Sequence, residues 1–231
     1  MVEGTKALVT THEIPALEVE VRQSLLKLTP YTTSNIRSLR RKFSKRIADF
    51  TPAAVIELAL NLLDQGIPRF FTYELIQFHR PAAKSLNAQK LKKLGAGIKS
   101  WVDVDTFACY LSGPAWRERQ ISTSEIERWA NSKDRWWRRA AVVSTVPLNN
   151  KARGGRGDVE RTLHICRMVV QDRDDMVVKA LSWALRELAK RDPSVVESFV
   201  RTHADELAPR VIREVRNKLR TGLKNPKKEG R

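Results

Sequence analysis

One eight-residue pattern occurs twice in this sequence, 40 positions apart, and it limits the folds open to the chain. The first copy covers residues 134–141 and the second covers residues 174–181. Each copy begins with an aspartate that is suited to cap a helix, and each places a basic residue, Arg139 or Lys179, before a small one. A period of roughly 40 residues is typical of proteins built from repeated helix pairs. The pattern therefore favours a HEAT-like helical repeat.

Apolar residues recur at helical spacing through most of the chain, and no segment alternates convincingly in the manner of a strand. We predict an all-α, HEAT-like solenoid of antiparallel helix pairs with a concave basic face. It forms a single domain over residues 1–220, followed by a basic flexible tail at 221–231. A compact irregular helical domain is the alternative. The expected helices cover residues 18–28, 34–50, 52–66, 70–78, 87–94, 126–130, 136–146, 159–170, 176–190, 194–203 and 209–219, and one more begins after Ser100.

The charge of the chain points to an anionic partner. There are 43 Lys and Arg residues against 26 Asp and Glu, which gives a formal net charge of +17. Such an excess suits a nucleic acid or an anionic membrane surface, and the plainer alternative is a solvated surface. No apolar stretch approaches the roughly 20 residues that span a bilayer, and the first residues lack the basic-then-apolar pattern of a signal peptide. We expect a cytoplasmic protein whose two cysteines, Cys109 and Cys166, are buried free thiols.

The segment from Ser100 to Asp105 joins an indole and a carboxylate at the start of an expected helix. Ser100 is suited to be the N-cap, and Asp103, at the third helical position, is suited to complete a capping box. Asp105 lies one turn after Trp101, so both side chains share one helix face. A salt bridge is the usual role for such an aspartate. An unpaired acid facing DNA would repel phosphate and would need a chemical reason, such as stabilising a developing cation.

Further aromatic and basic residues follow in the second half of the chain, where all six tryptophans lie. Trp136 and Trp137 are adjacent on a helix and point about 100° apart, so at most one faces the centre of the core. Arg139 is suited either to contact a phosphate or to pair with an aspartate of a neighbouring repeat. Residues 151–157 combine three basic residues with three glycines and no apolar anchor. This segment is expected to be a flexible connector that can also contact phosphates.

Three motifs together resemble the AlkD-type DNA alkylation repair family, which consists of HEAT-like-repeat DNA glycosylases. They are Trp101-x-x-x-Asp105, the Trp-Trp-Arg-Arg-Ala-Ala segment that contains Arg139, and the Ala-Leu-Ser-Trp-Ala-Leu-Arg-Glu segment that contains Trp183. The resemblance covers roughly residues 15–220. It implies that Asp105 is the catalytic carboxylate, that Trp101 and Trp183 pack on the deoxyribose of the lesion, and that Arg139 contacts DNA. The family often carries a tyrosine in an early helix, whereas Tyr31 here lies in a turn.

The resemblance implies a monofunctional DNA glycosylase, a hydrolase of base excision repair. Its substrates would be the cationic alkylpurines N3-methyladenine and N7-methylguanine in duplex DNA, removed without base flipping. No lysine is placed to form a Schiff base, and the histidines at 12, 79, 164 and 203 are too scattered to bind a metal. We expect no cofactor, no metal, no membrane partner, and a nucleoid-associated monomer. The expected DNA contacts are Arg138, Arg139, Lys179, Arg153 and Arg156.

Two other functions remain open from the residues alone. One is a non-catalytic HEAT-like protein that recognises damaged or branched DNA, which the basic charge supports equally well. The other is a HEAT-like scaffold for protein partners, for which a less basic surface is expected. Asp105 distinguishes the enzyme from the pure DNA binder, because a binder gains nothing from a carboxylate directed at the DNA backbone.

Overall fold

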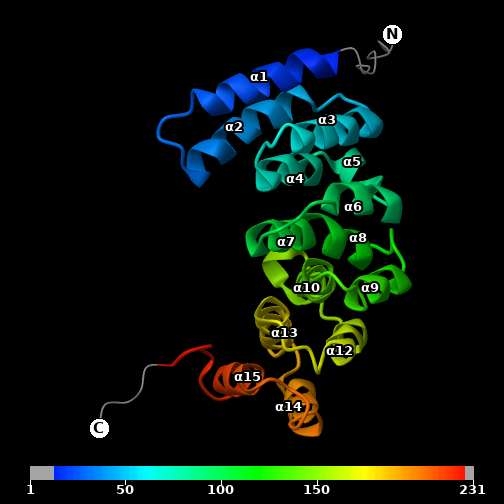
Figure 1. The fold of residues 1–231 in the computed structure, drawn as a ribbon, viewed down its shortest axis with the longest axis vertical. Coiled ribbons are helices and arrows are strands. Elements are labelled where there is room, and N and C mark those ends of the chain that lie inside the picture. The colour runs from blue at the N-terminus through cyan, green and yellow to red at the C-terminus, as the bar shows by residue number, and fades with distance from the viewer. Residues whose placement is uncertain (1–12, 227–231) are drawn as a thin grey trace, which may run out of the picture. The chain divides into compact units, whose positions relative to one another are not determined.

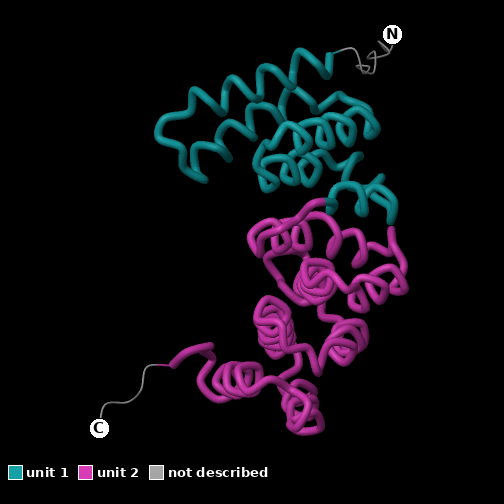
Figure 2. The backbone as a smooth tube through the Cα atoms, viewed as in Figure 1, with its two compact units in different colours: residues 1–96 teal, residues 97–231 magenta. Residues whose placement is uncertain are grey.

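The computed structural model describes residues 13–226, which contain helices and loops and no β-strand. This confirms the predicted all-α class. The chain divides into two compact units, Met1–Ala96 and Gly97–Arg231 (Figure 2). His12 and residues 227–231 of the predicted tail lie outside the described residues.

The first unit is built around α3 (Pro52–Asp64). The side chain of Thr51 accepts a hydrogen bond from the amide of Ala54, and Pro52 occupies the first turn, as the sequence predicted. Helix α3 contacts α1, α4, α5 and α6, and α2 packs against α1 and α4. The bounds of these helices are α1 (Ile14–Leu26), α2 (Thr33–Arg46), α4 (Arg69–Phe78), α5 (Arg80–Lys84) and α6 (Ala88–Gly95).

The second unit places all of its labelled helices in two rows, which can be followed in Figure 1. The first row consists of α7 (Trp101–Phe107), α10 (Arg135–Val143), α13 (Asp175–Leu188) and α15 (Pro209–Thr221), each in contact with the next. The second row consists of α8 (Gly113–Arg117), α9 (Thr123–Ala130), α12 (Val159–Met168) and α14 (Pro193–Thr202). Contacts within α9–α10, α12–α13 and α14–α15 form the helix pairs of a HEAT-like repeat. Three short helical segments complete the unit, a π-helix at Ala108–Ser112, α11 (Val146–Asn149) and a 3-10 turn at Lys151–Arg153.

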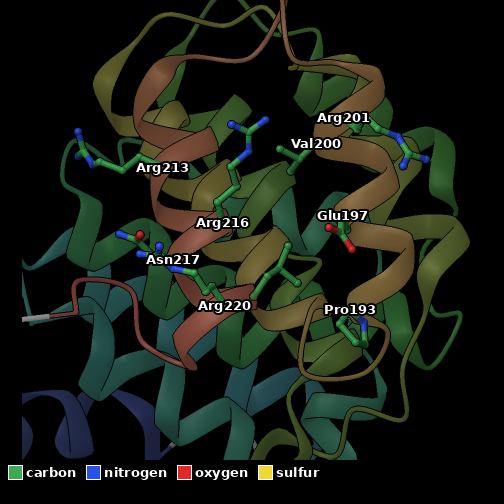
Figure 3. A pocket seen from close by; sticks show the side chains of 9 residues that line it. Pro193, Glu197, Val200, Arg201, Arg213, Arg216, Asn217 and Arg220 are labelled. Atoms are coloured by element: carbon green, nitrogen blue, oxygen red, sulfur yellow. The ribbon is translucent and has the colours of Figure 1, made fainter.

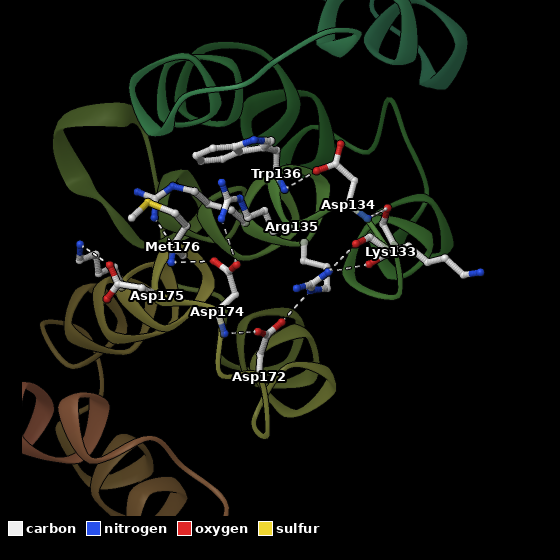
Figure 4. A network of polar contacts seen from close by, with 12 residues as sticks. Lys133, Asp134, Arg135, Trp136, Asp172, Asp174, Asp175 and Met176 are labelled. Carbon is white, nitrogen blue, oxygen red and sulfur yellow. Dashed lines mark hydrogen bonds and ion pairs between the residues drawn. The ribbon is translucent and has the colours of Figure 1, made fainter.

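The repeated sequence pattern corresponds to two equivalent helix starts (Figure 4). Asp134 caps α10 by accepting from the amide of Trp136 at 2.8 Å, and Asp174 caps α13 by accepting from the amide of Met176 at 2.9 Å. Arg135 also lies 3.5 Å from Asp174, so the start of one helix is linked electrostatically to the start of the next. The two copies of the sequence pattern, 40 residues apart, therefore occupy equivalent positions in the structure.

The segment after α10 differs from the prediction. The helix was expected to continue to Val146, but α10 ends at Val143 and Pro147 lies in the first turn of α11. Proline is tolerated there because the first amides of a helix have no helical partner. Cys109 and Cys166 are buried and free, as predicted, and burial raises the pKa of each thiol to about 12.

The loop at 150–157 is anchored, contrary to the expected flexible connector. The amide of Gly155 donates to the carbonyl of Asn150 at 2.8 Å, and the amide of Gly157 donates to the carbonyl of Leu148 at 3.0 Å. The guanidinium of Arg191 also donates to the carbonyl of Gly155. Gly155 is itself buried, and a Cβ at this position would lie 2.6 Å from the carbonyl oxygen of Pro147. Main-chain hydrogen bonds, which composition does not reveal, replace the missing apolar anchor.

Candidate active site

Helix α7 begins with the N-cap residue that the sequence predicted, Ser100, and the acid three residues later bonds to its hydroxyl. Ser100 Oγ accepts from the amide of Asp103 at 3.2 Å and donates to Asp103 Oδ2 at 2.8 Å. Asp103 is therefore the acid that serves the helix terminus. Asp105 lies two residues further on and has a different partner.

Asp105 forms a bidentate ion pair with Arg139 of α10. Arg139 Nε donates to Asp105 Oδ1 at 2.9 Å, and Nη2 donates to Oδ2 at 2.8 Å. Of the two states considered for Asp105, the structure shows the salt-bridged carboxylate and not the unpaired one. Of the two roles considered for Arg139, the structure shows the ion pair with a neighbouring repeat. Such a fork fixes the plane of the carboxylate as well as its position.

The same guanidinium joins three neighbouring helices of the first row. Arg139 Nη1 donates to the carbonyl oxygen of Met176 in the first turn of α13. Arg139 is only 5% exposed, whereas the side chain of Asp105 keeps 18% of its surface accessible. The arginine is thus held within the protein, and the carboxylate keeps some access to solvent.

Burial and pairing act on the carboxyl of Asp105 in opposite directions. Burial raises the pKa of Asp105, while the hydrogen bonds and positive charge of Arg139 lower it, and the pKa stays above the ordinary aspartate value. Each carboxylate oxygen uses one lone pair on Arg139 and retains another. The group can therefore act as a fixed negative charge and as a hydrogen-bond acceptor.

An aromatic cluster supports α7 and α10 beside this pair. The ring centroid of Trp137 lies 4.9 Å from that of Trp129 and 6.0 Å from that of Phe107. Its neighbour Trp136 instead packs against the guanidinium of Arg135 at 4.9 Å. This confirms that only one member of the adjacent tryptophan pair faces the core.

Trp101 and Trp183 differ from the other four tryptophans. Within residues 13–226, neither ring makes an indole N–H hydrogen bond, a contact with another aromatic ring or a contact with a guanidinium, whereas each of the other four makes at least one of these. Trp101 is 55% exposed, and Trp183 is half-buried on α13, seven residues after Met176 and so on the same helix face. These are the two indoles that the family motifs selected.

The other four residues that were predicted to contact DNA lie elsewhere in the second unit, and three of them have partners within the protein. Lys179 pairs with Asp175 at 2.6 Å, and Arg138 pairs with Asp172 at 2.6 Å. The guanidinium of Arg153 lies over the ring of Tyr110 at 5.1 Å. Arg156 is exposed and lines a small pocket of about 240 Å³ whose walls come from α8, α12 and the loop before α12. The structure brings none of these four into contact with Asp105 among the described residues.

The histidines of the described region have partners unrelated to metal binding. His79 accepts from the amide of Ala82 at the start of α5, while His164 and His203 each contact a glutamate. Within the described residues, no group of three or more His, Cys, Asp or Glu side chains could hold a metal ion.

Sequence reasoning missed two features of this unit. The first is the carbonyl of Met176, which carries no side-chain signal. The second is a group of arginines on α14 and α15, whose spacing at 213, 216 and 220 could have indicated a basic helix face.

The fold and the site define a HEAT-like repeat protein with a carboxylate and an accessible indole on one helix of its first row. The model of the DNA alkylation repair enzyme family matches residues 29–219, and the chain belongs to that family. Its role is therefore in the repair of alkylation damage, as an enzyme, with DNA as its partner. A search of curated proteins finds no match. In the described part of the chain, no helix has the length and apolar character that crossing a membrane requires.

Proposed function

We propose that this protein is a monofunctional DNA glycosylase that removes cationic alkylated purines from duplex DNA. The observation that carries the proposal is the carboxylate of Asp105, fixed by two hydrogen bonds from Arg139 and one turn from an exposed indole. N3-methyladenine and N7-methylguanine are the substrates that the family resemblance implies. The damaged base would be released without first being flipped out of the DNA duplex into a protein pocket.

The chemistry of these substrates suits a site with one catalytic carboxylate. The C1′–N bond breaks and its electron pair passes to the base, which neutralises the positive charge of the alkylpurine. No general acid is needed, and positive charge develops on the sugar. Asp105 stabilises this charge, water adds to C1′, and its proton passes to Asp105 or to solvent. Glycosidases that act on neutral sugar bonds usually need two carboxylates instead.

The two tryptophans without partners support the same assignment. An indole face attracts a cation through its quadrupole, and it also packs well on a sugar. Trp101 is free to do so because its side chain is exposed and makes no competing hydrogen bond among the described residues. Trp183 supplies the second face in the proposal. Arg139 acts as a positioning residue, because its guanidinium is turned toward Asp105 and the protein interior.

Base release from methylated DNA tests the proposal. Wild-type protein should release N7-methylguanine or N3-methyladenine, and Asp105→Asn should lower the single-turnover rate by about 10²–10³, in line with the loss of one charge-stabilising group. Asp103→Asn is the matched control, because it removes a carboxylate two residues away that serves only the helix cap. An Asp105→Asn protein that is as fast as wild type would remove Asp105 from the chemistry.

A non-catalytic DNA-binding protein is the second candidate, and one observation favours it. The ion pair with Arg139 gives Asp105 a structural reason to be present that does not require catalysis. If wild-type protein binds methylated duplex and releases no base, this second function replaces the first.

A further inference from the structure

A cleft between α14 and α15 gathers four arginines at the end of the second unit (Figure 3). Its volume is about 720 Å³. The cationic lining consists of Arg201 from α14 and of Arg213, Arg216 and Arg220 from α15, opposed by a single carboxylate, that of Glu197. All four arginines are exposed.

These arginines differ from most others in the second unit because their charges are not compensated. Within residues 13–226, none of the four makes a hydrogen bond or an ion pair through its guanidinium. In contrast, Arg138 and Arg139 are bound to aspartates and Arg191 to two main-chain carbonyls. A polar face is expected on the last helix pair of a repeat protein, but solubility alone is served equally well by mixed charges.

The arrangement on α15 suits a linear polyanion. Residues at 213, 216 and 220 lie on one helix face and extend over about 10 Å along the axis, given a rise of about 1.5 Å per residue. The opposite face of α15, with Val211 and Val215, is buried in the unit. The arginines thus present a rigid row of positive charge rather than a set of mobile chains on a loop.

We infer that this arginine cleft binds the phosphate backbone of DNA at a second place, beyond the site around Asp105. The inference rests on the proposed function for the location of the lesion. A duplex that lies along the first row from α7 would reach α15 after three helix-to-helix steps, or roughly 25–30 Å at about 8–10 Å each. This distance corresponds to about 8 base pairs at roughly 3.4 Å each. DNA is favoured over an acidic protein segment because the family acts on DNA.

Salt dependence of binding to an undamaged duplex of about 30 base pairs tests the contact without requiring catalysis. The variant Arg216→Gln/Arg220→Gln should lower the slope of log affinity against log salt by about 1.8, since each lost phosphate contact contributes about 0.9. Arg128→Gln/Arg167→Gln is the matched control. It removes the same formal charge from exposed positions on α9 and α12 in the second row, where Arg128 pairs with Glu125. Equal slopes for the two double variants would overturn the inference.

Duplex length provides a second measurement. A long duplex that carries 7-methylguanine at its centre is used first. With it, the half-maximal rate of base release should require a higher concentration of the Arg216→Gln/Arg220→Gln protein (the cleft variant) than of wild type. With a hairpin-closed duplex of about 5 base pairs on either side of the lesion, this difference should disappear, because the DNA ends before α15. A difference that persists on the short duplex contradicts the inference. If wild-type protein releases no base, the proposed activity is refuted. The salt slopes would still test whether the arginine cleft contacts DNA.

An acidic partner protein is distinguished in the same experiment. If the cleft variant binds DNA as the control does but loses affinity for a labelled polyglutamate peptide, the cleft serves an acidic protein and the DNA contact is wrong.

Discussion

The guanidinium of Arg139 lies between the carboxylate of Asp105 and the main-chain carbonyl of Met176. Its position orients the proposed catalytic group and ties α7, α10 and α13 together at one point. Its charge also limits how far burial raises the pKa of Asp105. One side chain therefore influences the packing of the site and its titration.

The pH dependence of base release separates these two roles. The active form of Asp105 is the carboxylate, so activity falls as pH decreases through its pKa, which lies above the ordinary value of about 3.9. Arg139→Gln removes the charge that lowers this pKa, and the acid limb of the profile should move to higher pH. Arg139→Lys, which keeps the charge, should move it less.

Arg138→Gln is the control for this prediction, because it removes a neighbouring guanidinium that pairs with Asp172. An acid limb that is unchanged by Arg139→Gln would show that the arginine has only a packing role. Each variant is compared at temperatures where circular dichroism shows a folded protein, because breaking a buried ion pair costs about 3 kcal/mol or more.

Sequence motifs predicted which residues carry the proposed chemistry but not how they contact one another. Ser100 and Asp103 form the expected cap because capping depends on local spacing alone. The ion pair between Asp105 and Arg139 joins residues 34 positions apart, and only the packing of α7 against α10 creates it. The sequence allowed an ion pair for each residue but did not indicate that the two pair with each other.

At the scale of elements, helix starts were predicted more accurately than the segments between helices. Thr51, Asp134 and Asp174 cap the helices that follow them, because an aspartate or threonine before an apolar periodic run has a local physical role. The loop at 150–157 was not predicted, since its order comes from carbonyls and from Arg191, which is distant in sequence.

Substitution of Gly155 tests the anchoring of this loop. Gly155→Ala would place a methyl group against the carbonyl of Pro147 and the amide of Asn150, at 2.6 and 2.7 Å. The free energy of unfolding should fall by about 1–3 kcal/mol, the range for overpacked sites, as measured by urea denaturation. Ala152→Gly, at an exposed position of the same loop, should have a much smaller effect. Equal stability of Gly155→Ala and wild type would indicate that the loop readily rearranges.

At the scale of the whole molecule, the basic residues around Asp105 account for only a small part of the net charge of +17. Arg138, Arg139 and Lys179 each pair with an aspartate, so charge available to DNA comes from elsewhere on the surface. Composition predicted a polyanionic partner, and the structure places four charges of this excess, without ion pairs among residues 13–226, at the arginine cleft.

Undamaged duplex should therefore bind with a strong dependence on salt. If six to ten phosphates are contacted, affinity should fall by about 10³–10⁵ between 50 and 200 mM salt. Fluorescence anisotropy with a labelled duplex measures this directly. An affinity that changes little over this range would show that the basic surface is mostly solvated and that few phosphates are contacted.

The arginine cleft has another consequence, for the behaviour of concentrated protein. The last helix pair of a repeat stack exposes the surface on which a further pair would otherwise pack. Here the face formed by α14 and α15 carries four like charges without internal partners among the described residues. Two copies brought together at this face would repel each other, and repulsion would be strongest at low ionic strength. The arginine cleft therefore resists self-association through this face, and a polyanion that neutralised it would remove that protection.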